Sequence, residues 1–355
     1  MSAAQARGFE LTKSARTVKL VVWDLDDTIW SGTLAEGDAV RLRGEIPDIL
    51  RSLDSRGILH SVASRNEHDH GMAKIREFGL AEYFLYPQIN WNSKSDNIRR
   101  IAEAVNIGLD AICFVDDQSF EREEVLYSLP DVMTLDASEA LDIPLRPEFM
   151  PRFITEDSAR RRRMYQSDLE RKALEETWTG PKDEFLASLN MIFTVSTAGE
   201  SDLQRAEELT LRTNQLNSTG YTYSYEELDA YRRSPDHLLL IAELEDRFGT
   251  YGKIGLALIE KREPFWTLKL LLMSCRVMSR GAGSILLTYI METARRNGAR
   301  LRAEFKTTDR NRMMLVTYKF ANFREVERDG SLRLLEHDLE TIPPVPAYVT
   351  MRVRE

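Results

Sequence analysis

Short apolar segments alternate with helix-like segments over about 120 residues of the N-terminal half, and this alternation constrains the fold most strongly. Strands are expected at residues 18–23, 58–63, 83–86, 111–115 and 132–135, where apolar and β-branched side chains cluster. Helical patterns fill the intervals, at residues 46–56, 69–78, 94–105 and 121–129. Strands that alternate with helices predict an α/β fold with a doubly wound parallel sheet.

The second half is separated from the first by a proline-rich edge. Residues 144–152 contain Pro144, Pro147 and Pro151, and a charged helix is expected at about 158–176. Further strands are expected at 238–245, 253–261 and 266–274, with a helix at 283–297. We therefore expect a first domain at 17–145, a linker at 146–181 and a second α/β domain at 182–355.

Composition restricts the functional class. The chain has 355 residues, and 48 Lys and Arg stand against 57 Asp and Glu, which gives a net charge of -9 and disfavours a nucleic-acid partner. Two cysteines can build neither a disulfide framework nor a Cys-rich zinc site, as expected in a reduced compartment. No stretch reaches about 18 apolar residues, and residues 1–16 read as an irregular leader without a signal sequence. A cytoplasmic protein with no membrane contact is the expectation.

Polar residues follow three of the expected strands directly. Asp24, Ser64 and Asp116 each come immediately after an apolar run. Because the carboxyl ends of parallel strands share one edge of a sheet, we expect these side chains to meet. Asp24 and Asp26 form a carboxylate pair in which one can attack phosphorus while the other moves a proton.

Other residues complete a phosphoryl-transfer constellation. The Ser64 hydroxyl can donate to a phosphoryl oxygen, and Lys94, at the start of a helix, can neutralise its charge. Asp116 and Asp117 supply the hard oxygen ligands that Mg²⁺ prefers. The alternative is that these acids are ordinary loop residues, but the whole set at fitting element ends favours a site.

The order of these motifs resembles the haloacid dehalogenase (HAD) superfamily. Its marks are Asp-x-Asp-x-Thr at 24–28, Ser64 after the second strand, a downstream Lys94 and an acidic pair at 116–117. The resemblance implies that Asp24 is a nucleophile that forms an aspartyl-phosphate, with Asp26 as general acid and base. Thr28 and Ser64 would hold the phosphoryl group, and Lys94 would bridge it to Asp24.

The same resemblance implies a Mg²⁺ site. Its ligands would be Asp24, the backbone carbonyl of Asp26, Asp116 and Asp117. About 35 residues separate Thr28 from Ser64 and about 30 separate Ser64 from Lys94, so neither interval can hold a large cap domain. An open site is expected, with the second half as the candidate for excluding water or accepting a bulky partner.

A narrower similarity is to FkbH-like proteins, the HAD subfamily IIIC proteins of polyketide assembly. It covers roughly residues 17–325 and includes the peptides at 24–32, 64–67, 114–117, 121–123, 212–217 and 274–277. The similarity implies that a glyceryl unit is taken from 1,3-bisphosphoglycerate, a small phosphorylated three-carbon substrate, and loaded onto an acyl carrier protein through its phosphopantetheine thiol. Asn66, Asn214 and Gln215 are counted among the substrate-binding residues.

Two cysteines are available for a thioester with the substrate, Cys113 and Cys275. Many FkbH-like proteins have a Cys just before the serine that ends the second strand, but this chain has Ala63 there. Cys113 lies inside a strand and is expected in the core. Cys275 is the remaining candidate thiol and is counted as substrate-binding, with burial as the alternative.

The second half carries its own resemblance. Residues 280–285, Arg-Gly-Ala-Gly-Ser-Ile, precede a helix and resemble the acetyltransferase (GNAT) signature, which implies a GNAT-like fold with a pyrophosphate or pantetheine cradle. Ile285 stands where that signature has Gly or Ala, and is expected to crowd a diphosphate. The polar cluster at 213–217 is either a wall facing substrate or a turn with satisfied hydrogen bonds.

Three functions remain at this stage. The first is a Mg²⁺-dependent phosphatase coupled to glyceryl transfer; the second is a phosphatase on another small or carrier-bound phosphate, with the GNAT-like domain as a lid. The third is a non-catalytic docking protein, which the intact nucleophile and metal ligands disfavour. The arginine run at 160–163 is either a dock for an acidic carrier or a solvated helix face.

Overall fold

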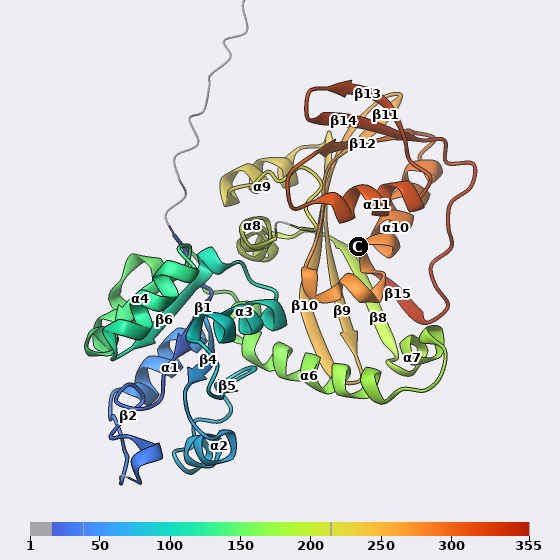
Figure 1. Ribbon diagram of the computed structural model, residues 1–355. Coiled ribbons are helices and arrows are strands. Elements are labelled where there is room, and N and C mark those ends of the chain that lie inside the picture. The colour runs from blue at the N-terminus through green and yellow to red at the C-terminus, as the bar shows by residue number, and fades with distance from the viewer. Residues whose placement is uncertain (1–15, 38, 214, 355) are drawn as a thin grey trace, which may run out of the picture. The chain divides into compact units, whose positions relative to one another are not determined.

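The computed structural model describes residues 16–37, 39–213 and 215–354, and the chain divides into two compact units, Met1–Arg162 and Arg163–Glu355. The division falls inside helix α6 (Arg161–Thr177), within the interval expected to link the domains. Figure 1 shows the elements of both units. In the part of the chain that is described, no helix is both long enough and apolar enough to cross a bilayer.

The first unit is built on a five-stranded parallel sheet in the order β5-β4-β1-β6-β7. Neighbours of β1 on its two sides come from different parts of the chain, so the strand order reverses at β1, and ligand crevices form at such a point. The strands are β1 (Leu20–Trp23), β4 (Leu59–Ser64), β5 (Gln88–Ile89), β6 (Ile112–Asp116) and β7 (Met133–Asp136), and the helices are α1 (Ile46–Ser55), α2 (His68–Glu77), α3 (Lys94–Val105) and α4 (Ser119–Ser128).

The described residues between β1 and α1 form only small elements. They are a two-stranded antiparallel sheet of β2 (Trp30–Ser31) and β3 (Arg41–Leu42), with a 3-10 turn, η1 (Leu34–Glu36). The expected doubly wound α/β unit without a large cap is therefore confirmed. One expected strand is wrong: residues 83–86 form no strand apart from an isolated bridge between His60 and Phe84, because Tyr86 has a positive φ of 52° that bends the chain there.

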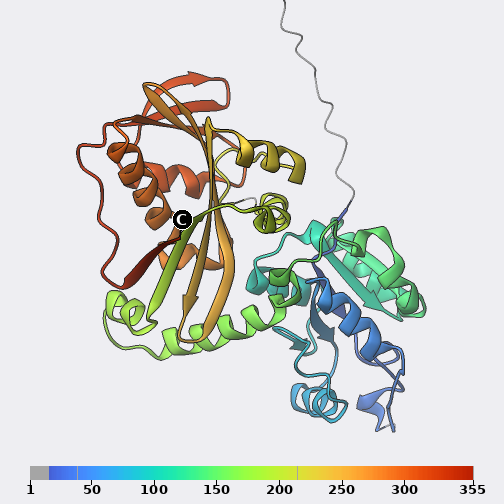
Figure 2. The ribbon, with the colours of Figure 1, turned by 180° about the vertical axis from the view of Figure 1, so that it is seen from behind.

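The second unit contains an eight-stranded sheet in the order β13-β14-β12-β11-β10-β9-β8-β15. Two different helix layers cover its two faces, since alternate residues of β9 and β10 enter two separate apolar clusters. Helices α10 (Ala282–Arg296) and α11 (Arg312–Phe320) lie on one face, with α8 (Leu203–Arg212) and α9 (Tyr225–Arg233) on the other, as both views show (Figures 1 and 2). An α/β fold is thus confirmed here too.

The strands of this sheet are mostly antiparallel. Only β11 with β12, which helix α10 connects, and β8 with β15 run parallel. Their bounds are β8 (Met191–Thr197), β9 (His237–Asp246), β10 (Gly249–Arg262), β11 (Phe265–Met273), β12 (Arg300–Lys306), β13 (Arg324–Asp329), β14 (Leu332–His337) and β15 (Val349–Arg354), and α7 (Lys182–Ser188) precedes them.

The arginine run differs in part from the expected solvated helix face, because Arg161 and Arg162 are buried while Arg160 and Arg163 are exposed. The charged helix is interrupted at Arg160, between α5 (Glu156–Ala159) and α6, and the run divides by burial. Arg161 is buried and donates to the Gly57 carbonyl at 3.1 Å, while Arg162 bonds Asp54 and Glu82. Two of the four arginines therefore stabilise the first unit, because a buried guanidinium needs such acceptors.

Candidate active site

The site of the first unit lies at the carboxyl edge of its parallel sheet. Asp24 directly follows β1, while Ser64 and Asp116 are the last residues of β4 and β6, the two neighbours of β1. Lys94 is the first residue of α3, whose start is capped by Ser93. All four side chains are buried, so the strand ends bring them together as expected.

Lys94 is the centre of the charged contacts. Its ammonium donates to Asp24 Oδ1 and, at 2.9 Å, to the carbonyl of Ala63, and it lies 3.0 Å from Asp116 Oδ2. These contacts fix one lysine between two carboxylates in a place where water has little access. Burial lowers the pKa of Lys94, but the two carboxylates outweigh it and hold that pKa above its ordinary value.

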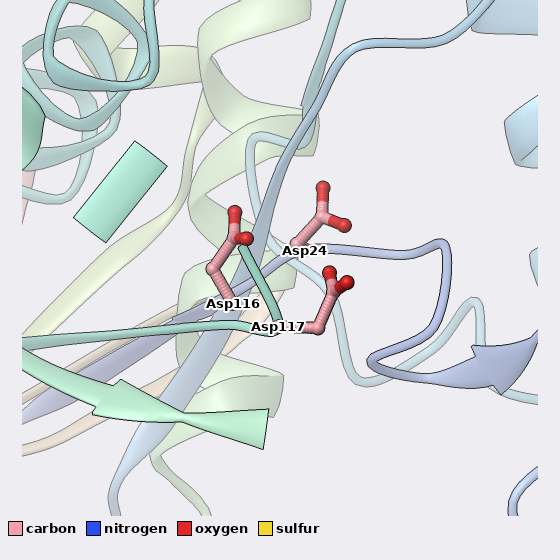
Figure 3. A group of neighbouring side chains, drawn as sticks. All are labelled: Asp24, Asp116 and Asp117. Carbon is pink, nitrogen blue, oxygen red and sulfur yellow. The ribbon is translucent and has the colours of Figure 1, made fainter. Parts of the chain in front are cut away.

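The site contains more acidic groups than positively charged groups. Asp24, Asp116 and Asp117 each offer an oxygen, and these oxygens lie within 4.8 Å of one another (Figure 3). Burial raises the pKa of Asp24 to about 6, because Lys94 opposes the cost of desolvation only in part and Asp116 adds to it. Burial, with Asp116 next to it, also raises the pKa of Asp117. Three acids against one lysine leave the pocket short of a cation.

These residues fit Mg²⁺. One Asp117 oxygen, Oδ1, is buried without a hydrogen-bond partner among the described residues, as expected of an oxygen that a cation would satisfy. The donor set of carboxylate oxygens is the hard-ligand chemistry of Mg²⁺. Asp24, Asp116 and Asp117 would hold the ion, and an ion there would favour their charged forms.

Asp26 is held apart from this cluster. Its Oδ1 accepts hydrogen bonds from Trp30 Nε1 at 2.8 Å and from the Leu34 backbone at 3.0 Å, and its Oδ2 accepts from Asn66 Nδ2 at 2.8 Å. The Asp26 side chain is not among the clustered acids, which agrees with an expected ligand role for its backbone carbonyl alone. Three donors give this carboxylate a fixed orientation, which a proton-transferring group requires.

The other expected first-unit residues occupy the same edge. Thr28 is buried, and its hydroxyl oxygen accepts from the Asp117 backbone N–H at 3.2 Å, which leaves its hydroxyl hydrogen to donate. Ser64 makes a side-chain hydrogen bond with Asp24. Asn66, expected to bind substrate, donates a hydrogen bond from its side-chain amide to Asp26 and so positions that carboxylate.

The residues expected from the second half lie in the other unit. Asn214 is outside the described residues, Gln215 is exposed and Cys275 is half-buried at the start of a 3-10 turn after β11. The Asn217 side chain closes its own turn, because Oδ1 accepts from the backbone of Thr219 and Gly220. This favours the turn alternative for that end of the polar cluster.

The segment 216–218 completes the sheet between two strands that diverge. β11 and β12 pair only from Phe265 to Leu268. Beyond that point the segment bonds both: Ser218 N donates to Leu271 O at 2.9 Å, and Lys306 N donates to Ser218 O at 3.0 Å. The fully buried Asn311 amide fastens it at 3.0 Å from Asn217 O. The chain itself therefore saturates these strand edges.

Ile285 does not crowd the start of α10. Its side chain is buried in the apolar cluster of the second unit, so it points away from the backbone amides at the start of the helix. The expectation of a crowded diphosphate is therefore wrong, because the helical turn places residue 285 on the core face.

Sequence reasoning missed two features of the site. Trp30 was part of a matching peptide, but its role as a donor to Asp26 depends on the turn that follows β1. In that turn Asp27 has a φ of 48° and accepts from the Gly32 N–H at 2.9 Å. The pair of Arg65 and Glu121, 3.2 Å apart, was also not foreseen. A charged residue directly after Ser64 was the available signal.

Known proteins similar to this chain agree with the geometry. The human magnesium-dependent phosphatase 1 is 32% identical over 123 residues, which covers 29% of this chain and 70% of that protein. The chain belongs to the HAD-family magnesium-dependent phosphatases. No family model matches it.

Two solved structures are similar to parts of this HAD-family chain. One is the N-terminal part of a Bacteroides fragilis protein that contains a phosphatase domain complexed with Mg, with 27% identity over 36% of this chain and a TM-score of 0.33. The chain spans 39% of the length of that structure. Another is the ribosomal-protein-S18-alanine N-acetyltransferase of Escherichia coli, with 16% identity over 41% of this chain and 90% of that one, and a TM-score of 0.32.

Proposed function

We propose that the first unit is a Mg²⁺-dependent phosphatase that works through an aspartyl-phosphate. The observation that carries this is the buried meeting of Asp24, Lys94 and Asp116 at one sheet edge, beside an Asp26 held by donors of its own. Two carboxylates in such different surroundings suit two different tasks.

In the proposed reaction an Asp24 oxygen attacks the phosphorus of a phosphate monoester. The bond from phosphorus to the leaving oxygen breaks with its electron pair, and that oxygen takes a proton from Asp26. A water molecule then gives a proton to Asp26 while its oxygen attacks the same phosphorus. The Asp24–phosphorus bond breaks, so phosphate leaves and both carboxyl groups return to their first states.

The positive groups act on charge that develops in these steps. Lys94 stays beside Asp24 throughout, and Thr28 and Ser64 supply hydroxyl donors for phosphoryl oxygens. A bound Mg²⁺ ion supplies charge neutralisation for the phosphoryl group.

We further propose 1,3-bisphosphoglycerate as the substrate and an acyl carrier protein as the acceptor. The support is the similarity of the peptides at 212–217 and 274–277 to FkbH-like proteins, in addition to the phosphatase motifs. The carrier thiol would attack the acyl carbon and expel the acyl phosphate, which gives a thioester and phosphate. The phosphatase site would remove the other phosphate as a monoester, and the glyceryl unit would remain on the carrier.

Of the two cysteines, only Cys275 suits an intermediate thioester. Cys113 lies in β6 in the core, and burial raises the pKa of its thiol far above the ordinary value. Cys275 is half-buried. Direct attack by the carrier thiol needs neither residue.

The test uses the full chain with Mg²⁺, 1,3-bisphosphoglycerate and a pantetheinylated carrier protein. Release of the second phosphate, the one held as a monoester, is expected to need Mg²⁺, to stop on chelation and to fall at least a thousandfold in Asp24→Asn, while Asp110→Asn, on a surface turn, leaves it unchanged. A glyceryl mass increase on the carrier supports transfer. Phosphate release without that increase would contradict the transfer, and release of the monoester phosphate that survives in Asp24→Asn would contradict the nucleophile. Full transfer in Cys275→Ala would exclude a thioester on this protein.

A further inference from the structure

Arg65 follows a residue of the phosphatase site, and its positively charged guanidinium makes few contacts with the protein. It follows Ser64, the last residue of β4, and its side chain is 41% exposed. Its guanidinium lies 3.2 Å from Glu121 Oε1 in the first turn of α4. Neither residue enters the proposed phosphoryl chemistry.

The pair spans the strand that ends at the nucleophile. Arg65 belongs to the end of β4, and Glu121 to the helix that follows β6, while β1 lies between β4 and β6. Neighbouring strands are about 4.8 Å apart, so a contact between these two residues bridges the position of β1 and its successor Asp24. The guanidinium therefore lies at the same carboxyl edge of the sheet as Asp24.

The contact with Glu121 uses few of the hydrogen-bond donors of Arg65. A guanidinium has five N–H donors, and among the described residues Arg65 makes this one ion pair and no hydrogen bond. By comparison, Arg162 in the same unit donates to Asp54, to the Glu82 carboxylate and to the Glu82 carbonyl. Glu121 is buried, and its Oε2 has no hydrogen-bond partner among the described residues. Because its own side chain is held in the interior, Glu121 serves as an anchor for the exposed guanidinium.

We propose that Arg65 is a specificity-determining residue that binds a second anionic group of the substrate, a carboxylate or acyl phosphate a few bonds from the reacting phosphate. Planar guanidinium donors match such groups in a forked geometry. The substrate class is then a small phosphate monoester with a distal anion, and not a simple alkyl phosphate. This inference rests on the proposed phosphatase function and names the substrate feature that the site selects.

Two stable compounds separate the distal anion from the reacting phosphate. 3-Phosphoglycerate carries a carboxylate where glycerol 3-phosphate carries a hydroxymethyl group, and the two are otherwise closely matched. The measured quantity is the ratio of kcat/KM for the two compounds with Mg²⁺. Dissociation constants for both are also measured by calorimetry in the Asp24→Asn background, which needs no turnover.

Arg65→Ala is expected to lower the kcat/KM ratio about thirtyfold and to weaken binding of 3-phosphoglycerate by a similar factor. Arg65→Lys keeps the charge without the fork and should retain part of the preference. Glu121→Gln should keep the preference within about threefold. Arg99→Ala is the matched control, because Arg99 is 45% exposed and pairs with Asp96 on the outside of α3. That variant should keep the wild-type ratio.

Opposite results would overturn the proposal. They are a wild-type protein without preference for 3-phosphoglycerate, or an Arg65→Ala variant that loses activity on both compounds equally, which would mean that the pair is only structural. If no phosphate is released from any compound but the binding difference persists and depends on Arg65, the phosphatase function fails while the anion site stands.

Discussion

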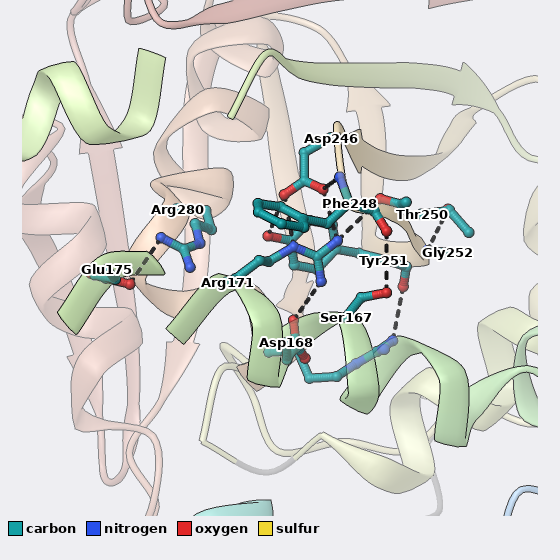
Figure 4. Close-up of polar contacts among 12 residues, drawn as sticks. Ser167, Asp168, Arg171, Glu175, Asp246, Phe248, Thr250, Tyr251, Gly252 and Arg280 are labelled. Atoms are coloured by element: carbon teal, nitrogen blue, oxygen red, sulfur yellow. Dashed lines mark hydrogen bonds and ion pairs between the residues drawn. The ribbon is translucent and has the colours of Figure 1, made fainter. Parts of the chain in front are cut away.

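Each unit contains a buried charge cluster, and the two clusters differ in how completely they are paired. In the first unit, Asp24, Asp116 and Asp117 face one lysine, and Asp117 Oδ1 has no hydrogen-bond partner among the described residues. In the second unit, Arg171 and Asp246 are buried as well, but they form a direct ion pair with two hydrogen bonds (Figure 4). The first cluster lacks a positive charge that a bound cation would supply, whereas the second cluster is neutralised by the protein's own side chains.

The paired cluster joins helix α6 to the β9–β10 hairpin. Arg171 donates from Nε and one terminal nitrogen to the two Asp246 oxygens at 2.7 and 2.8 Å, and from the other to Asp168 at 2.8 Å. Asp246 also accepts from the Tyr251 hydroxyl at 3.0 Å and the Phe248 backbone at 2.9 Å. The guanidinium lies 3.8 Å from the centre of the Tyr251 ring.

Completeness of pairing therefore separates a structural charge cluster from a functional one. A buried ion with all partners present is held by the fold alone, whereas a buried ion with missing partners costs stability unless something binds. Removal of one charged group should consequently destabilise the second unit at Arg171 and stabilise the metal-free first unit at Asp117.

The largest effect is expected for Arg171→Met. It leaves Asp246 buried without its counter-ion, so the free energy of unfolding should fall by about 3–5 kcal/mol. Urea denaturation measures this loss. Arg262→Met, at an exposed arginine of the same sheet, should change stability by less than about 0.5 kcal/mol. If the Arg171→Met and Arg262→Met variants were equally stable, the buried Arg171–Asp246 pair would not stabilise the second unit, and the contrast between the two charge clusters would be wrong.

A buried neutral group should produce the next largest effect. His60 accepts from Trp23 Nε1 at 3.1 Å and donates to the Leu50 carbonyl at 3.2 Å, and burial lowers its pKa from 6.5 to about 3. At pH values between 3 and 6.5, His60 is protonated in the unfolded chain but stays neutral in the folded protein. Stability is therefore lost as the pH falls below 6.5, by about 2 kcal/mol at pH 5.

His60→Gln can keep both hydrogen bonds but cannot take up a proton. Denaturation of this variant at a series of pH values should show a flatter curve between pH 6.5 and 5 than the wild type. A variant that retains the full wild-type slope would assign the acid sensitivity to other groups.

Removal of an orienting contact should slow catalysis. Asn66→Ala deletes the 2.8 Å donor to Asp26, which then keeps two of its three hydrogen bonds and is oriented less firmly, so kcat for p-nitrophenyl phosphate should fall about tenfold. KM should change less, because Asn66 acts through Asp26. Asn92→Ala, on the exposed loop before α3, is the control. A variant with raised KM and unchanged kcat would instead make Asn66 a substrate ligand.

The smallest effect tests the excess of acid directly. Asp117→Asn removes a charge that its surroundings disfavour, so the metal-free protein should become more stable by less than about 1 kcal/mol, since solvent screens a half-exposed group. Mg²⁺ affinity should weaken about tenfold, measured by Mg²⁺-dependent thermal stabilisation. Loss of stability in this variant would show that its charge is already satisfied.

Much of the first unit was predictable because its signals are local. The helix at Lys94–Val105 agrees with the expected range, and β1, β4 and β6 lie within a few residues of theirs. Since a parallel sheet brings strand ends to one edge, the meeting of Asp24, Ser64 and Asp116 followed from strand positions alone. The two-residue β5 was not predictable, because its short pairing depends on the turn at Tyr86.

By itself the sequence determined which acidic, hydroxyl and lysine side chains stand at the ends of the strands and at the start of a helix, because apolar periodicity and residue type are properties of neighbours in the chain. Tertiary structure alone decided how those charges are balanced. Lys94 between two carboxylates, Asn66 on Asp26, Arg65 across β1 to Glu121 and Arg171 against Asp246 all join residues distant in sequence. The physical reason is that burial and pairing depend on the environment that the whole fold creates around each charge, and no local pattern records that environment.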